Sequence, residues 1–118
     1  MSQLLLVGFG GAAGSILRYL CQRPLNTDGF PYGTLAVNIV GCLIIGILWA
    51  FFSRTNVQET TRLLLMTGFC GGFTTFSAFT YEGVQMLTQG RLIPFVLYTS
   101  ISVIVGLVAT FAGYKCFQ

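Results

Sequence analysis

Three stretches of this chain contain no charged residue and are each long enough to cross a lipid bilayer. They are residues 33–53, 63–81 and 92–114. An α-helix needs about 20 apolar residues to span the hydrocarbon core. Residues 4–17 form a shorter apolar run, which reaches Cys21 if the guanidinium of Arg18 extends to a wet boundary. We therefore expect four transmembrane helices, over residues 4–21, 33–53, 63–86 and 92–115.

The composition supports a membrane protein rather than a soluble domain. Charged residues make up 8% and hydrophobic residues 54% of the 118 residues, and the mean hydropathy is +0.80. A soluble domain carries about 25% charged residues, so this chain has too few to cover a surface that faces water. We expect one integral membrane domain over residues 1–118. The six Lys and Arg residues are scattered without a basic cluster, and the net charge of +3 therefore does not indicate nucleic-acid binding.

The cysteines do not form a metal or disulfide pattern. The four cysteines are spread singly, and the chain has no histidine. A zinc site or a disulfide framework would require paired or regularly spaced ligands, so we interpret the cysteines as small apolar side chains. The N-terminal residues lack the basic region of a signal peptide, and we expect them to be retained as the first helix.

Positive charges are balanced between the two ends of the predicted helices. If the N-terminus is cytoplasmic, the cytoplasmic side receives Arg54, Arg62 and Lys115, and the opposite side receives Arg18, Arg23 and Arg91. An excess of Lys and Arg on the cytoplasmic side normally fixes orientation. Its absence favours insertion in both orientations and an antiparallel homodimer with its twofold axis in the membrane plane. The alternative is a weak local bias that selects one orientation.

Two predicted helices carry polar residues along one face. Asn38 shares a helix face with Thr34 and Gly41, and Tyr98 and Ser102 lie four residues apart. Each stripe by itself is compatible with interhelical hydrogen bonding and packing. Polar groups at membrane depth face protein or a water-filled cavity, so two such stripes on separate helices favour a lined pathway.

The third predicted helix is interrupted near its middle. Two glycines followed by two threonines, over residues 71–75, are a poor helix centre. Backbone carbonyls that an unwound segment frees are good ligands for Na⁺. Phe76 and Phe79 follow on one helix face, a spacing that by itself favours packing. Glu82 ends this segment; an interfacial or structural role is favoured there over a proton relay.

Three segments together resemble the Fluc (CrcB-type) fluoride channels. They are GGAAGSILRY at residues 10–19, GTLAVNIVG at residues 33–41 and GFCGGFTTFSAF at residues 68–79. The resemblance covers nearly the whole chain. It implies an all-α fold of four transmembrane helices with a broken third helix, assembled as a dual-topology homodimer in the bacterial inner membrane. It further implies two antiparallel pores that passively export F⁻, with no enzymatic activity.

The resemblance also implies roles for individual residues. The pore-lining residues would be Phe76, Phe79, Asn38, Ser77, Thr80, Tyr98 and Ser102, with Arg18 in a vestibule. A structural Na⁺ at the centre of the dimer would be held by the backbone carbonyls of Gly71 and Thr74. The expected partners are fluoride, the lipid bilayer and a second copy of the chain.

Physical chemistry makes these roles reasonable. Dehydrating a small anion without replacing its water is very costly, whereas a pore lysine would hold the ion too tightly for conduction. Phenyl ring edges offer a weak positive contact, and Asn38, Ser102 and Tyr98 offer hydrogen-bond donors. A small proton-coupled multidrug or guanidinium exporter, which needs a carboxylate in its cavity, and a membrane subunit that transports nothing are the alternatives.

Overall fold

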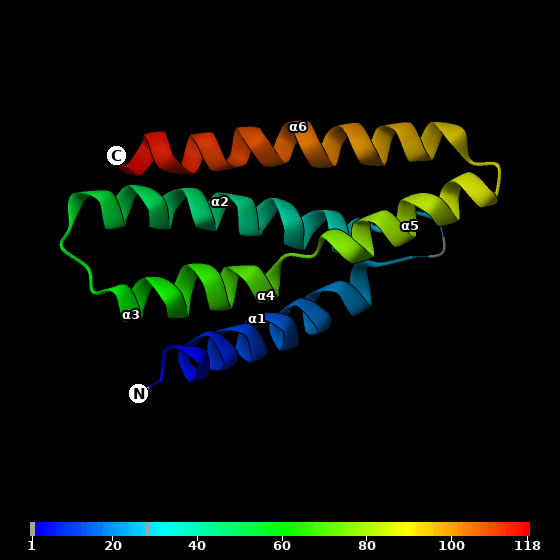
Figure 1. The fold of residues 1–118 in the computed structure, drawn as a ribbon. Helices are drawn as coiled ribbons and strands as arrows, with labels where there is room; N and C mark the ends of the chain where they lie inside the picture. Colours follow the sequence, from blue (N-terminus) through cyan, green and yellow to red (C-terminus); the bar gives the residue numbers. More distant parts are fainter. Residues whose placement is uncertain (1, 28) are drawn as a thin grey trace.

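The computed structural model describes residues 2–27 and 29–118, and the chain folds as a bundle of long helices that run side by side (Figure 1). In order, the elements are α1 (Gln3–Leu25), α2 (Tyr32–Arg54), α3 (Glu59–Arg62), the π-helix η1 (Leu63–Cys70), α4 (Gly71–Phe73), α5 (Phe76–Thr88) and α6 (Leu92–Phe117). The elements α3, η1, α4 and α5 follow one another along a single interrupted helix. The N- and C-termini lie at the same end of the bundle (Figure 1).

Four helical segments are long and apolar enough to cross a membrane, which confirms the expected number of spans. They are Gln3–Leu25, Tyr32–Arg54, Glu59–Thr88 and Leu92–Phe117. The first helix continues past Cys21, the end predicted from the sequence, and runs to Leu25 with Pro24 in its last turn. The helix therefore includes Gln22, which the sequence analysis placed in a loop.

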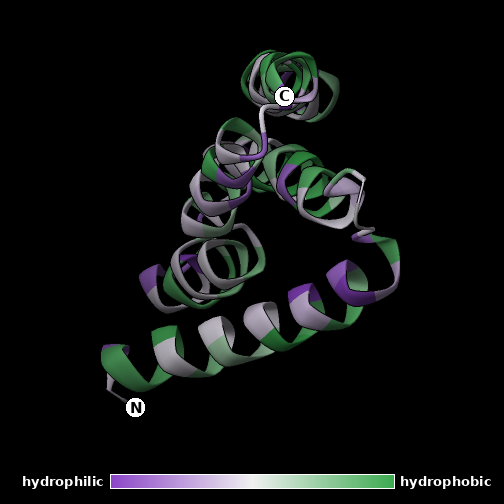
Figure 2. Cartoon of the chain, turned by 90° about the vertical axis from the view of Figure 1, so that its right-hand side faces the viewer, coloured by the Kyte–Doolittle hydropathy of each residue, from purple (hydrophilic) through white to green (hydrophobic). Residues whose placement is uncertain are grey.

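Large apolar side chains point outward from the bundle. Leu4 is 83% exposed, Ile93 74% and Leu107 69%, and Figure 2 shows hydrophobic residues on each long helix. Such a surface would be unfavourable in water. It is the surface expected of helices whose apolar side chains contact lipid tails.

Small residues allow the helices to approach closely. A Cβ atom on Gly72 would lie 3.0 Å from backbone carbon atoms of Gly11, and a Cβ on Gly68 would lie 3.0 Å from the Cα of Gly10. The glycine pairs Gly10 and Gly14 of α1 and Gly68 and Gly72 of the third helix therefore each pack against the other helix. On the other side of the bundle, Gly46 of α2 approaches the backbone of Thr110 in α6 in the same way.

The break in the third helix is narrower than predicted. Gly71 and Gly72 are helical, so the predicted interruption over residues 71–75 was wrong for them. Only Thr74 (φ −93°, ψ 158°) and Thr75 (φ −149°, ψ 119°) adopt extended backbone conformations. Gly72 packs closely against Gly11 of α1, and this contact offsets the low helix propensity of glycine, about 1 kcal/mol. β-branched threonines suit the extended conformation.

Candidate functional site

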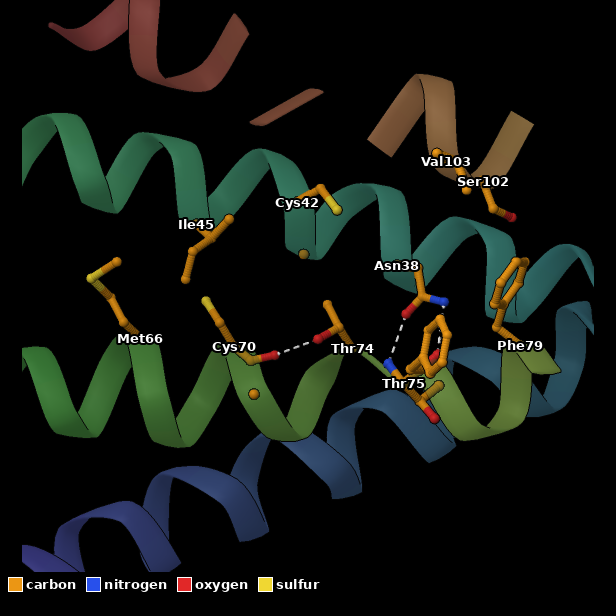
Figure 3. Close-up of a pocket in the computed structure, with 13 residues that line it drawn as sticks. Asn38, Cys42, Ile45, Met66, Cys70, Thr74, Thr75, Phe79, Ser102 and Val103 are labelled. Atoms are coloured by element: carbon orange, nitrogen blue, oxygen red, sulfur yellow. Dashed lines mark hydrogen bonds between the residues drawn. The ribbon is translucent and has the colours of Figure 1, made fainter. Parts of the chain in front are cut away.

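A side chain from α2 replaces the backbone partners that the break removes. The Nδ2 group of Asn38 donates to the carbonyl of Thr75 at 3.0 Å, and the N–H of Thr75 donates to Oδ1 of Asn38 at 2.7 Å. Figure 3 shows this pair beside the cavity described below. The Thr75 hydroxyl caps α5 by accepting from the N–H of Ala78 at 3.2 Å. The two threonines are thereby held in one conformation.

Arg18 contacts the break from the side of α1. Its Nε donates to the carbonyl of Gly72 at 3.0 Å. The N–H and hydroxyl of Thr74 both donate to the carbonyl of Cys70, at 3.1 and 2.9 Å. Among the described residues, no side chain and no backbone N–H outside the helices donates to the carbonyl oxygens of Gly71, Phe73 and Thr74. Helix ends normally satisfy such groups.

A cavity of about 400 Å³ lies between α2, α6 and the broken helix. It brings together six of the residues predicted to form the site: Asn38, Gly71, Thr74, Phe76, Phe79 and Ser102. Figure 3 shows Asn38 and Phe79 pointing into the space beside Ser102. The two stripes of polar residues predicted on the second and fourth helices thus meet at this cavity.

Aromatic rings and one hydroxyl without a partner line part of this cavity. The rings of Phe76 and Phe79 have centroids 5.8 Å apart and are inclined at 45°. Phe79 also packs on Tyr98, at 5.3 Å and 53°. The Oγ atom of Ser102 is buried and has no hydrogen-bond partner among the described residues. A buried hydroxyl without a partner is costly, so this atom is available to a ligand.

Three residues that were predicted to line the pore lie outside the cavity. Ser77 and Thr80 are exposed on α5, where the Thr80 hydroxyl donates to the carbonyl of Ser77 at 3.0 Å. Tyr98 is completely buried, and its hydroxyl donates to Oε1 of Glu82 at 3.0 Å. The hydroxyl proton of Tyr98 is therefore directed to a carboxylate rather than into the cavity. Tyr98 contributes to the wall of the cavity through its ring, which packs against Phe79.

Glu82 belongs to a hydrogen-bonded cluster that the sequence analysis missed. Its Oε2 accepts from the hydroxyl of Thr34 at 2.8 Å and from Nδ2 of Asn26 at 3.3 Å. Thr34 also accepts from Gln22 at 2.8 Å. The position of Thr34, one helical turn before Asn38, could have indicated from the sequence that Thr34 belongs to this cluster. Nothing in the sequence indicated Gln22 and Asn26, because the first helix was predicted to end at Cys21.

Glu82 also lines a second, polar cavity of about 390 Å³ at one end of the bundle. Asn26, Gln85, Gln89 and Arg91 line it as well. The guanidinium of Arg91 donates to the carbonyl of Gly29 there.

The described residues contain no cluster of three or more side chains of the metal-binding types His, Cys, Asp and Glu. The carbonyl oxygens at the break are therefore the candidate ligands for a cation. Carbonyl oxygens favour hard ions such as Na⁺ over soft transition metals.

The fold and the cavity together define a small multi-pass helical membrane protein with an aromatic-lined cavity beside a break in one membrane-spanning helix. The chain belongs to the CrcB family. The profile of this family, described as CrcB-like protein, Camphor Resistance (CrcB), matches residues 5–114. The family resemblance found in the sequence is thereby confirmed.

Curated relatives match along nearly the whole chain. A protein from Phocaeicola vulgatus is 43% identical over 116 residues, which cover 96% of both chains. A protein from Rhizobium etli is 47% identical over 117 residues, covering 96% of this chain and 94% of the relative. One from Leptospira interrogans is 47% identical over 114 residues, covering 93% and 90%. Each of these relatives is named fluoride-specific ion channel FluC.

Proposed function

We propose that this protein is a fluoride-selective ion channel that lets F⁻ leave the cell passively. The observation that carries the proposal is the cavity in which two phenyl rings, an asparagine and a hydroxyl without a partner meet at membrane depth. The relatives that bear the name fluoride-specific ion channel support it, because they match over nearly the full length of this chain.

The lining of the cavity suits a small, strongly hydrated anion. The free Oγ of Ser102 offers one donor, and the second N–H of the Asn38 amide offers another. The edges of the Phe76 and Phe79 rings carry partial positive charge. Helix α5 begins at Phe76, so the positive end of its dipole lies beside the cavity. These contacts replace water without a fixed charge that would trap the ion.

The route that we propose passes other polar residues. Ser77 and Thr80 follow the rings on α5, and the Tyr98 ring supports Phe79 from α6. Arg18 supplies positive charge beside the break, through its contact with Gly72, and would attract anions to a vestibule.

We further propose that two copies assemble as an antiparallel dimer in the bacterial inner membrane, each with its own pore. The balanced positive charges on the two sides support insertion in both orientations. The ring of Phe76 is 76% exposed in a single chain, and a Cβ on Gly71 would meet nothing within 4 Å. A second copy that packs here would complete the walls of the cavity.

A Na⁺ ion at the centre of this dimer is part of the proposal. Gly71 and Thr74 are two of the three residues at the break whose carbonyl oxygens accept from no described side chain and from no backbone N–H outside the helices. Two copies related by a twofold axis would present four such oxygens. Exchanging Na⁺ for K⁺ during purification should lower the melting temperature of the dimer. An unchanged melting temperature, with no ion density on the axis, would contradict the Na⁺ site.

Fluoride efflux from liposomes tests the channel directly. Purified protein should release F⁻, but not Cl⁻, from loaded vesicles once a K⁺ ionophore balances the charge. Phe76→Ile removes the ring edge, and Asn38→Asp replaces donors by a carboxylate, so each should reduce F⁻ flux by about tenfold or more. An F⁻-selective electrode measures the rates.

The control is Thr88→Val on the exposed end of α5, whose hydroxyl only contacts the carbonyl of Gln85. It should keep the wild-type rate. No F⁻ flux, or equal F⁻ and Cl⁻ flux, would refute the channel. Glu82 argues against a proton-coupled exporter, because all three of its hydrogen bonds are with donors of the protein, and such an exporter would need this carboxylate free to exchange protons.

A further inference from the structure

A chain of hydrogen bonds connects the helix break to the carboxylate of Glu82. Nη1 of Arg18 donates to Oε1 of Gln22 at 3.3 Å, while its Nε holds the carbonyl of Gly72. Nε2 of Gln22 donates to the hydroxyl of Thr34 at 2.8 Å, and that hydroxyl donates to Glu82 at 2.8 Å. We call Arg18, Gln22, Thr34 and Glu82 the relay. It crosses from α1 through α2 to α5.

The direction of every bond in the relay follows from the chemistry of its ends. Arginine has only donors, so the amide oxygen of Gln22 must face Arg18 and its NH₂ must face Thr34. Thr34 is fully buried and also accepts from Asn26 at 3.2 Å. With both lone pairs used, its single proton must point to Glu82. The hydrogen bonds in such a chain polarise one another, because a cation stands at one end of the chain and an anion at the other.

The far end of the relay holds the ring that backs the cavity. Thr34 and Asn26 bind Oε2 of Glu82, which leaves Oε1 for the hydroxyl of Tyr98 at 3.0 Å. The ring of Tyr98 packs on Phe79 at 5.3 Å, and Phe79 lines the cavity. The position of Glu82 therefore determines how far the Tyr98 ring and, with it, Phe79 are able to move.

We infer that Gln22 and Thr34 are positioning residues that set the width of the anion pathway at Phe79, and so its selectivity. Neither residue lines the cavity. They act through Glu82 and Tyr98, which fix the wall behind the ring. A rigid wall excludes by size any anion larger than fluoride. Such an anion would have to displace the wall, and that displacement would break a hydrogen bond to the carboxylate of Glu82. This inference rests on the proposed channel function.

The test compares F⁻ and Cl⁻ efflux from liposomes for variants of the two residues. Gln22→Glu is nearly isosteric and keeps the partner of Arg18, but it removes the donor to Thr34. Thr34→Val keeps the shape and removes the hydroxyl. Each should lower the ratio of F⁻ to Cl⁻ flux by about tenfold. Thr34→Ser restores a hydroxyl and should keep the wild-type ratio.

A double variant shows whether the two residues act as one unit. Because Gln22 acts through Thr34, the combined Gln22→Glu and Thr34→Val variant should be no less selective than Thr34→Val alone. Gln58→Glu is the matched control, since Gln58 is exposed and the only described partner of its side chain is Thr60, at 3.4 Å. It should behave as the wild type.

The results distinguish a failure of the proposed channel function from a failure of this inference. A wild type that conducts no F⁻ would refute the channel itself. A wild type that selects F⁻ over Cl⁻, together with an unchanged ratio in Gln22→Glu, would refute the inference alone. If Thr34→Val does not fold, Gln22→Glu decides the outcome, because it introduces no cavity. Additive losses in the double variant would likewise overturn the relay as a unit.

Discussion

At the scale of single residues, the site separates polar groups that are satisfied by the protein from one that is not. The amide of Asn38 is paired with Thr75, and the hydroxyl of Tyr98 is paired with Glu82. The Oγ of Ser102 is buried without a described partner. A native protein keeps such a group only at a cost in stability. Under the proposed function, this hydroxyl is kept at the cavity as a donor to the ion.

Ser102→Ala should therefore separate stability from transport. Removing a buried hydroxyl that has no partner should leave the melting temperature unchanged or slightly raised, because nothing in the fold loses a hydrogen bond. F⁻ efflux should fall by about tenfold, because the ion loses a donor. Ser53→Ala, whose hydroxyl donates to the carbonyl of Trp49 at 2.8 Å on an exposed surface, is the control. A destabilised Ser102→Ala protein with normal flux would contradict the role of this hydroxyl.

At the scale of elements, the break depends on neighbouring helices. Asn38 from α2 replaces the peptide partners of Thr75, and Arg18 from α1 holds the carbonyl of Gly72. The π-helix η1 and the short helix α4 lead into the break. Close contact between Gly72 and Gly11 brings α4 against α1. The position of α1 therefore determines whether Arg18 reaches the break.

Gly72→Ala should disturb this arrangement. Its Cβ would collide with the backbone of Gly11, and overpacking of this kind costs about 1–3 kcal/mol. The melting temperature in detergent should fall, and F⁻ flux should fall with it as Arg18 loses the carbonyl. Gly8→Ala is the matched control on the same helix as Gly11, because its Cβ would meet nothing within 4 Å. Equal stability of the two variants would show that the close approach is unimportant.

Helix number and the pairing of polar residues were predictable from the sequence, and the exact break was not. Hydropathy determines which segments span the bilayer, and spacing along a helix places Asn38 and Ser102 on inward faces. The helical state of Gly71 and Gly72 depends on the packing of Gly72 against α1, which propensity does not contain. The role of Gln22 depends on a helix that continues through Pro24, where the sequence suggested a stop.

At the scale of the whole molecule, equal numbers of basic residues lie toward the two ends of the bundle. Arg54 ends α2, Arg62 ends α3 and Lys115 lies in the last turn of α6; these element ends lie at the end of the bundle that carries both termini (Figure 1). Arg23 lies in the last turn of α1 and Arg91 precedes α6, at the other end of the bundle, and Arg18 lies five residues before Arg23 on α1. The balanced charge near the ends of the helices supports the proposed insertion in both orientations.

Labelling of Cys116 measures the orientation of the chain. This cysteine is exposed near the C-terminus. With the other three cysteines replaced by alanine, a membrane-impermeant maleimide added to intact cells should label about half of the protein, because both orientations are present. Ser53→Lys with Gln118→Lys should move that end into the cytoplasm and abolish labelling.

Gln89→Lys, which adds charge at the opposite end, is the counterpart and should increase labelling. Either complete labelling or none in the protein without added lysines would contradict dual insertion.

The side-chain pairing at the break also limits how the gene is able to vary. Asn38 matches a peptide group because its amide presents a donor and an acceptor on separate atoms. A single nucleotide change turns an asparagine codon into one for Asp, His, Ile, Lys, Ser, Thr or Tyr, none of which has an amide. Glutamine is two changes away and a methylene longer. No single nucleotide change at codon 38 therefore produces another side-chain amide that could replace the pairing with Thr75.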